Sequence, residues 1–411
     1  MVPTPPRDQG QTITSVTDVD DGPVLARANT RRLAGTAALL SLASSLLCLF
    51  VVWALLPPHG NLRHVLMMFD AVWYRHIALF GYSWNPHSNA QQTPNFFPLY
   101  PLLERGARVL TGLPISKIAV ASSILFQAGA AAILALIAAG CGASEREALT
   151  WVTLFVVSPP VVFDIMGYYS AVFCVLCFAA IYFAQRGQPW LVALALGFAS
   201  AANPLGIAFT GGFMTWAIIG LVSTSSFTRR SLLRLGAQGL VSVSGVIGYG
   251  LYLQVAFGNP LVFYQATKGW SVPVPIGTLV ARVVTFEPLR ASVTLWAASP
   301  YGSQVNFLFD ALAALAIVAL IIALVAVGDA VYNFGFWLLV FAFLLLQALS
   351  TRWGSEIGAL RILVPVAFGA GAVAPVRRAL TRPKVSAVIF VVFVALTAFL
   401  LQHLATGQWL D

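Results

Sequence analysis

Charged side chains are scarce in this sequence, and their scarcity excludes a soluble fold. They make up 9% of the 411 residues, whereas hydrophobic residues make up 59% and the mean hydropathy is +0.85. A soluble domain of this length could not hide so much apolar surface in its core. The sequence therefore predicts an all-α polytopic membrane protein, in which lipid is the main solvent.

Cysteine is equally sparse, and its placement argues against a disulfide framework or a zinc site. Cys48, Cys174 and Cys177 lie inside apolar runs, and Cys141 lies at the end of another. Four histidines share the first long loop, but they include no i,i+4 pair, so solvated interfacial side chains are the better interpretation. No cofactor is certain from these residues, and a divalent metal stays open.

Membrane topology can explain the net charge of +9. The basic residues form short clusters between apolar runs instead of covering one face, which favours membrane topology over a nucleic-acid partner. Residues 1–32 are polar and rich in Pro, Asp and Thr, so we expect a disordered cytoplasmic tail ahead of a transmembrane domain at 33–411.

Windows of about 20 apolar residues predict eleven membrane-spanning helices. They lie at 33–56, 115–140, 148–163, 168–185, 189–203, 204–223, 233–256, 305–327, 330–350, 357–376 and 385–403. Pro159, Pro160 and Pro204 interrupt two of these runs, which predicts bends or tight turns there.

Arginine in every second connection predicts the sidedness of the chain. The basic clusters begin at Arg31 and continue at 146, 186, 229–234 and 377–384. Because positive side chains are retained in the cytoplasm, the N-terminus is expected inside the plasma membrane. The C-terminus and two long loops, 57–114 and 257–304, are then expected outside. Loops of this length are usually functional or disordered, and the Trp, Tyr, Phe and Pro in both favour ordered structure.

The first of these loops contains a predicted interfacial helix at 68–82. Apolar and aromatic residues recur at helical spacing, and Asp70, Tyr74 and Ile77 share one sector. This sector is expected to meet the membrane. The carboxylate of Asp70 would then project from the membrane-facing side of the helix, where a charged group is unusual. An N-cap or a partner for Arg75 is the plainer role for Asp70.

The segments at 69–82 and 95–105 together resemble the PIG-V-type mannosyltransferases, which are membrane glycosyltransferases of the GT-C fold. The first segment contains Phe69-Asp70, followed by Trp73-Tyr74, and ends in Gly-Tyr. The second segment contains Phe-Phe-Pro-Leu-Tyr-Pro-Leu-Leu. Weaker similarities follow in the same order at 158–170, at 258–270, and at Arg361 with Pro365.

The resemblance implies transfer of mannose from polyprenyl-phosphate-mannose to a lipid-linked glycan acceptor on the outer face. Asp70 is the implied general base for the attacking hydroxyl, in a single inverting displacement. Arginines outside the membrane are candidates for the phosphate of the leaving group, since their planar fork can hold two oxygens. They include Arg352, and Arg361 is the preferred one. The predicted donor- and acceptor-binding residues are Tyr74, Arg75, Arg105, Asp164, Tyr169, Gln265, Lys268, Trp270 and Arg361.

Two departures from the family pattern keep alternatives open. Ala171 stands where the family has Glu, and Ala202 stands where it has Arg. The chain is therefore either a transferase with altered recognition or a non-catalytic homologue that binds or presents polyprenyl glycolipid to a partner. A transporter is a third interpretation, because broken helices suit a midplane site, but the sequence has no visible inverted repeat.

Overall fold

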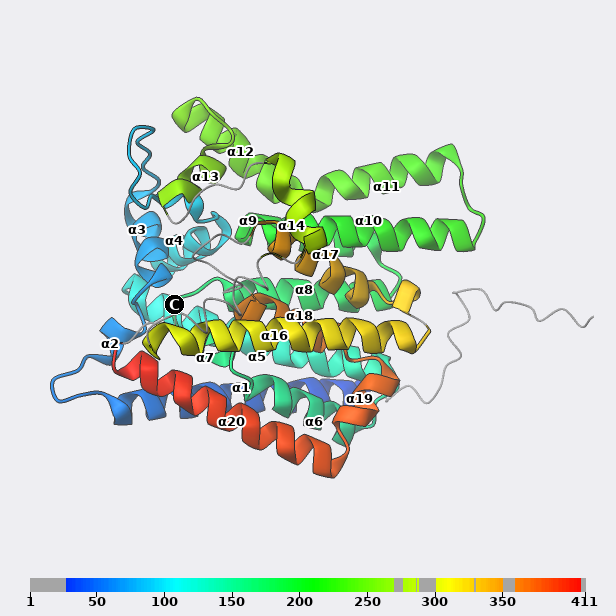
Figure 1. Cartoon of the computed structure of the whole chain (residues 1–411), viewed down its shortest axis with the longest axis horizontal. Coiled ribbons are helices and arrows are strands. Elements are labelled where there is room, and N and C mark those ends of the chain that lie inside the picture. Colours follow the sequence, from blue (N-terminus) through cyan, green and yellow to red (C-terminus); the bar gives the residue numbers. More distant parts are fainter. Residues whose placement is uncertain are drawn as a thin grey trace, which may run out of the picture.

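The computed structural model describes residues 27–269, 276–285, 287, 301–328, 330–349 and 359–407, and within these ranges all regular structure is helical. Long helices lie side by side, and their connections gather at two opposite ends (Figure 1). We call one end the arginine-rich end, because it carries Arg146, Arg186, Arg229 and Arg377. The other is the loop end, where α2, α3, α4 and α13 lie.

The element order follows the predicted alternation of apolar runs and connections. The longer helices are α1 (Arg27–Leu55), α5 (Ile115–Gly140), α6 (Glu145–Val156), α8 (Ser170–Gln185), α9 (Pro189–Ala202), α10 (Leu205–Ser223), α11 (Arg229–Ser242), α12 (Ser244–Phe257), α16 (Tyr301–Ala326), α17 (Phe334–Leu349) and α20 (Pro383–Ala405). The shorter ones that matter here are α2 (Leu62–Val65), α3 (Asp70–Phe80), α4 (Leu99–Thr111), α7 (Val161–Asp164), α13 (Val262–Gln265), α14 (Leu279–Thr285), η5 (Ala359–Leu363), α18 (Val364–Ala370) and α19 (Ala374–Leu380).

The chain is a multi-pass membrane protein, but several predicted spans are not single straight helices. Among the described residues, α1, α5, α10 and α20 are each long and apolar enough to cross a bilayer alone. The predicted span at 233–256 is a pair, α11 and α12, bent by 55°, and the span at 357–376 turns by 112° before α19. The span at 148–163 ends early, since Pro159 and Pro160 separate α6 from α7.

The two ends of the described chain lie at opposite ends of the helix bundle, as the predicted odd number of membrane spans requires. The helix α1 begins at the arginine-rich end, and α20 runs to the loop end, where its last turn lies beside α2 (Figure 1). A side chain added at Gly407 would lie 3.8 Å from the methyl group of Met68. The first loop and the end of α20 therefore share one end of the helix bundle.

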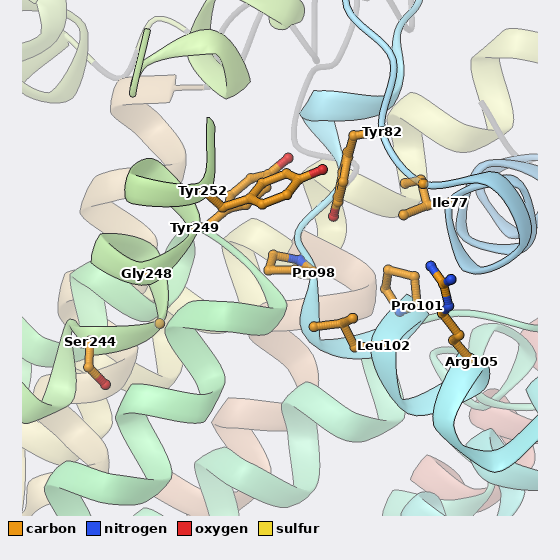
Figure 2. A pocket seen from close by; sticks show the side chains of 12 residues that line it. Ile77, Tyr82, Pro98, Pro101, Leu102, Arg105, Ser244, Gly248, Tyr249 and Tyr252 are labelled. Carbon is orange, nitrogen blue, oxygen red and sulfur yellow. The ribbon is translucent and has the colours of Figure 1, made fainter. Parts of the chain in front are cut away.

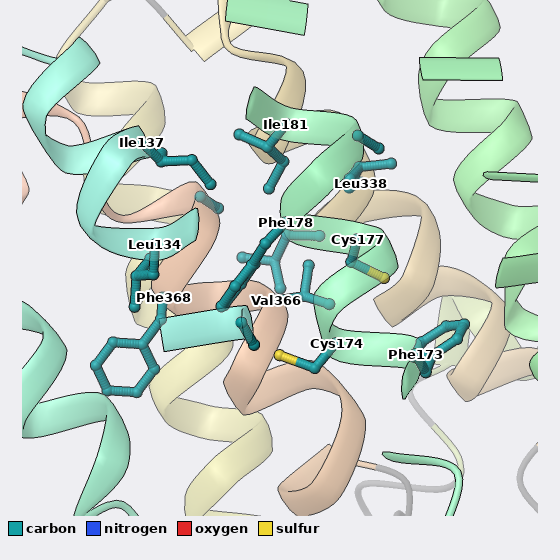
Figure 3. Packing of buried hydrophobic residues seen from close by; sticks show 14 of the residues in the cluster. Leu134, Ile137, Phe173, Cys174, Cys177, Phe178, Ile181, Leu338, Val366 and Phe368 are labelled. Atoms are coloured by element: carbon teal, nitrogen blue, oxygen red, sulfur yellow. The ribbon is translucent and has the colours of Figure 1, made fainter. Parts of the chain in front are cut away.

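The apolar core lies between α5, α8, α17 and α18 (Figure 3). Phe178 of α8 packs among Leu134, Leu338 and Val366, and these side chains are at most 1% exposed. The indole Nε1 of Trp151 donates a 3.1 Å hydrogen bond to the carbonyl of Phe368, so its polar atom is satisfied inside the core. This packing fixes α18, and with it the neighbouring turn η5, against the rest of the bundle.

The basic residue Arg377 has a second role beside the topological one that the sequence predicts. Its side chain is completely buried, and its guanidinium donates to the carbonyls of Ala372, Ala138 and Cys141. Two of these carbonyls belong to the C-terminal end of α5, where a helix has unpaired acceptors and a partial negative charge. Arg377 therefore ties α19 to α5 at the arginine-rich end.

The first long loop contains the helices that the sequence predicts, but one face of α3 is placed differently. Tyr74 and Ile77 are buried against α4 and α5, whereas Val72 and Phe80 are exposed. The expectation that the sector of Asp70 meets the membrane is therefore wrong, because helical periodicity groups residues on a face without identifying what covers that face. The carboxylate of Asp70 points into the protein.

Candidate functional site

The site forms where the start of α3 meets the turn η5, which is nearly 300 residues later in the chain. Arg361 Nη1 lies 2.9 Å from Asp70 Oδ2, and the two side chains keep only 16% and 18% of their surface exposed. This is a charge-assisted hydrogen bond in a mostly dry environment, where such bonds are strong. The structure thus brings together the predicted base and the preferred phosphate ligand.

The backbone around Asp70 is unusual. Phe69, which precedes the helix, has φ 59° and ψ −129°, a conformation that a bulky side chain rarely adopts. Asp70 is the first residue of α3, so its carboxylate lies at the positive end of the helix dipole. Its amide N–H donates a 3.2 Å hydrogen bond to the hydroxyl of Tyr168. Together with the bond from Arg361, these contacts fix the position of the carboxylate.

Arg361 lies in a π-helical turn and is held by aromatic rings as well as by Asp70. Its guanidinium carbon is 5.8 Å from the ring centre of Phe163 and 5.7 Å from that of Tyr168. Both distances fall within the range of cation–π attraction. The Nε atom is buried and has no hydrogen-bond partner among the described residues. An arginine with an unpaired donor is suited to receiving an anionic oxygen.

Two buried tyrosines, Tyr74 and Tyr169, pack next to this ion pair. The Tyr74 ring, one turn after Asp70, lies 5.9 Å from the Tyr169 ring, and Asn203 donates a 2.7 Å hydrogen bond to the Tyr169 hydroxyl. Burial raises the pKa of Tyr74 well above its usual range. This phenol is therefore neutral near pH 7 and can act only as a hydrogen-bonding and packing group.

Asp164 follows Phe163, whose ring contacts Arg361. The carboxylate of Asp164, however, has a different hydrogen-bond partner. It is 3% exposed and accepts a 3.0 Å hydrogen bond from the hydroxyl of Ser170. Burial raises its pKa to about 7, and the bond from Ser170 partly offsets this. Asp164 therefore supports the start of α8, and no described contact joins it to Arg361.

The remaining predicted site residues lie apart from the pair. Arg75 is exposed and lines a cleft of about 330 Å³ with Arg63 and His64. Arg105 lines a different groove beside α12. Gln265 is exposed, and Lys268 Nζ lies 3.4 Å from the carbonyl of Pro86. The predictions for Trp270 and Arg352 fall outside the described residues.

Sequence reasoning missed two residues at the site, Phe163 and Tyr168, and a buried acid on α4, Glu104. The two aromatic residues lie next to predicted ones, and their positions at the break between α6 and α8 were the available signal. Glu104 is 1% exposed, and neither carboxylate oxygen has a hydrogen-bond partner among the described residues. Burial raises its pKa to about 8.

Metal ligands do not gather in the part of the chain that the structure describes. Within it, no three His, Cys, Asp or Glu side chains lie close enough to hold a metal ion.

Comparisons with known proteins give distant similarities. No protein-family model matches the sequence, and no curated protein matches it. Among solved structures, the oligosaccharyltransferase of Archaeoglobus fulgidus, tethered to an acceptor peptide containing an NVT sequon, is similar over 93% of this chain, with 12% identity and a TM-score of 0.40. ArnT from Cupriavidus metallidurans, in its apo state, is similar over 81% of this chain and 77% of its own, with 14% identity and a TM-score of 0.32.

This chain spans 55% of the length of the archaeal oligosaccharyltransferase. Because both identities are low, no residue role is transferred from either protein. The candidate site is defined by the geometry of this chain alone.

Proposed function

We propose that the chain is a membrane glycosyltransferase of the GT-C fold that transfers mannose from polyprenyl-phosphate-mannose to a lipid-linked glycan. The observation that carries the proposal is the contact between Asp70 and Arg361 at the loop end. It pairs a carboxylate that can act as a base with a cation that can hold a phosphate, and the resemblance to the PIG-V-type enzymes supplies the substrate class.

Asp70 would take the proton from the attacking hydroxyl as the new glycosidic bond forms. A hydroxyl is a weak nucleophile, and a positioned base typically accelerates such a step by about 10²- to 10⁴-fold. The guanidinium 2.9 Å away would orient the carboxylate toward the hydroxyl that it deprotonates. The anomeric carbon would invert, and the bond to the phosphate oxygen would break in the same step.

Arg361 would stabilise the phosphate as it leaves with increased negative charge. One Nη atom is engaged by Asp70, whereas the buried Nε has no described partner. The Nε edge of the guanidinium would therefore receive a phosphate oxygen without breaking the contact with the base. Stabilising charge that grows in the transition state lowers the barrier more than it tightens ground-state binding.

The two departures from the family pattern leave this arrangement intact. Ala171 follows Ser170, whose hydroxyl donates to Asp164, so a buried carboxylate on the preceding short helix α7 lies next to the start of α8, where the Glu is missing. Asn203 follows Ala202 and holds Tyr169 beneath the site. These contacts favour the catalytic interpretation over a homologue that only binds glycolipid.

The test is transfer of radiolabelled mannose from polyprenyl-phosphate-mannose to glycolipid in membranes that carry the chain. Asp70→Asn and Arg361→Lys are compared with Glu145→Gln, an exposed acid at the arginine-rich end. We expect Asp70→Asn to lose about 10²-fold or more per inserted molecule, Arg361→Lys to be impaired, and Glu145→Gln to match the wild type.

Two outcomes would contradict the proposal. Activity of Asp70→Asn within tenfold of the wild type would remove Asp70 as the base. Absence of transfer by the wild type, together with retained binding of polyprenyl phosphate, would instead favour the non-catalytic homologue.

A further inference from the structure

A second cavity at the loop end lies at the far end of α3 from Asp70. It is a groove of about 400 Å³ between the end of α3, the helix α4 and the helix α12 (Figure 2). The helix α3 rises about 1.5 Å per residue, so Ile77 and Gly81, which line the groove, lie roughly 10 and 16 Å along the helix from Asp70. The groove is therefore separate from the ion pair but within reach of an extended ligand.

One wall of the groove is a rigid aromatic surface. The rings of Tyr82, Tyr249 and Tyr252 face one another (Figure 2), with ring centres 5.4 to 6.4 Å apart. The hydroxyls of Tyr82 and Tyr249 donate to backbone carbonyls at 94–96, so their rings are fixed and present flat faces. Such a wall suits a chain of apolar atoms, which needs surface and no hydrogen bonds.

The opposite wall carries charge of one sign. Arg105 lines the groove from α4, its guanidinium end points toward Ile77 (Figure 2), and Arg108 follows one turn later. None of the described residues that line the groove is acidic, and neither arginine makes an ion pair among the described residues. An apolar groove with an unpaired cation at its edge is complementary to an anionic lipid.

The groove opens to the surface of the protein. Leu102 and Tyr252, on its two walls, are 61% and 45% exposed. Between them, a side chain added at Gly248 would meet no atom within 4 Å. The helix α12 is the second half of a bent pair that starts at the arginine-rich end and is, taken together, long and apolar enough to cross a bilayer, so the open space borders a candidate membrane span.

We infer that this groove holds the anchor of the acceptor: a phosphate-bearing lipid whose hydrocarbon chain lies against the tyrosines and Gly248 while Arg105 binds its phosphate. The inference rests on the proposed function, in which the phosphate of the donor occupies Arg361. A second lipid needs a second site, and this groove supplies one on the other side of α3. The acceptor head group must then extend roughly 10 to 16 Å to place its hydroxyl at Asp70, which selects a glycan over a bare lipid head.

The test is photo-crosslinking, which does not require catalysis. The purified full chain is placed in phosphatidylcholine nanodiscs that contain a small fraction of phosphatidylglycerol with a diazirine in its acyl chain, and crosslinked peptides are mapped. The variants are Gly248→Leu, which fills the open space, and Arg105→Gln. The matched controls are Gly220→Leu, where an added side chain also meets nothing, and Arg108→Gln.

We expect crosslinks to concentrate at 98–105 and 244–252 in the wild type and to fall about tenfold in Gly248→Leu and Arg105→Gln, the change expected when one charged contact or the bound chain is lost. Both controls should match the wild type. A diazirine phosphatidylcholine should label the groove weakly, and inorganic phosphate should not compete, since the ligand is a lipid.

Two kinds of result would overturn the inference. Labelling spread evenly over the lipid-facing helices, or labelling unchanged in Gly248→Leu, would show that the groove does not select a lipid. Competition by polyprenyl-phosphate-mannose would assign the groove to the donor. A separate result bears on the proposed function alone: if Asp70→Asn transfers mannose normally while the groove is still labelled, the catalytic role of Asp70 fails and the lipid site stands.

Discussion

The contact between Asp70 and Arg361 predicts a large and specific coupling in stability. Breaking a buried ion pair by removing one partner costs about 3–5 kcal/mol, because the other charge is left unpaired. Both side chains retain a little exposure, 18% and 16%, so we expect the lower end, about 3 kcal/mol, for Asp70→Asn and for Arg361→Gln. The double variant leaves no unpaired charge and should cost only about 1–2 kcal/mol.

The measurement is a double-mutant cycle on equilibrium unfolding of the detergent-solubilised chain. The comparison is the pair Arg282–Glu287, whose atoms are 3.3 Å apart and whose Arg and Glu side chains are 11% and 60% exposed. Because solvent screens the exposed Glu, that pair should couple by about 1 kcal/mol, less than the pair of Asp70 and Arg361. The reasoning is refuted if the effects of Asp70→Asn and Arg361→Gln add to within about 0.5 kcal/mol, since additivity means that the residues do not interact.

Three further predictions follow from single side chains. Arg377→Lys should lower the free energy of unfolding by about 3 kcal/mol, because one ammonium cannot satisfy carbonyls in three directions, whereas the exposed neighbour Arg378→Lys should have no effect. Burial raises the pKa of Glu104 to about 8, above its unfolded value, so its contribution is full below about pH 4 and lost as the pH rises to 8. The pH dependence of the melting temperature should therefore flatten in Glu104→Gln. Tyr168→Phe removes the acceptor of the Asp70 N–H and should slow mannose transfer severalfold, about 1 kcal/mol, with the protein still folded.

Sequence reasoning located most of the helices because bilayer thickness fixes the length of an apolar run. It placed α5 and α10 within a residue of their observed ends, and α20 within two. It could not predict the bend between α11 and α12, since no proline marks that position. The angle depends on how the neighbouring helices pack: a side chain at Gly245 would clash with the carbonyl of Gly197 on α9, so only glycine permits this close approach.

The site was predictable only in part. Asp70 and Arg361 could be named separately, one from a motif and one from its place at the start of an apolar run, but nothing local indicates that they touch. Glu104 was missed because α4 reverses the usual pattern: Leu102 and Leu110 are exposed, and the carboxylate is buried. In a membrane protein the apolar face of a helix can meet lipid, so the inner face carries the polar residues that periodicity alone assigns to solvent.

Two irregular backbone segments meet at the candidate site, and their coincidence argues for function. Phe69 has a positive φ immediately before Asp70, and Arg361 lies in a π-helical turn. Each conformation is less favourable than a regular helix and persists only where its surroundings enforce it. Both irregularities aim a charged side chain at the same point, where the two atoms lie 2.9 Å apart. A site that served only packing would gain more from apolar residues on regular helices, because replacing a buried ion pair with such residues is often stabilising. The two irregular segments are therefore best explained as the cost of holding a carboxylate beside a guanidinium at this point, which is the arrangement that the proposed function requires.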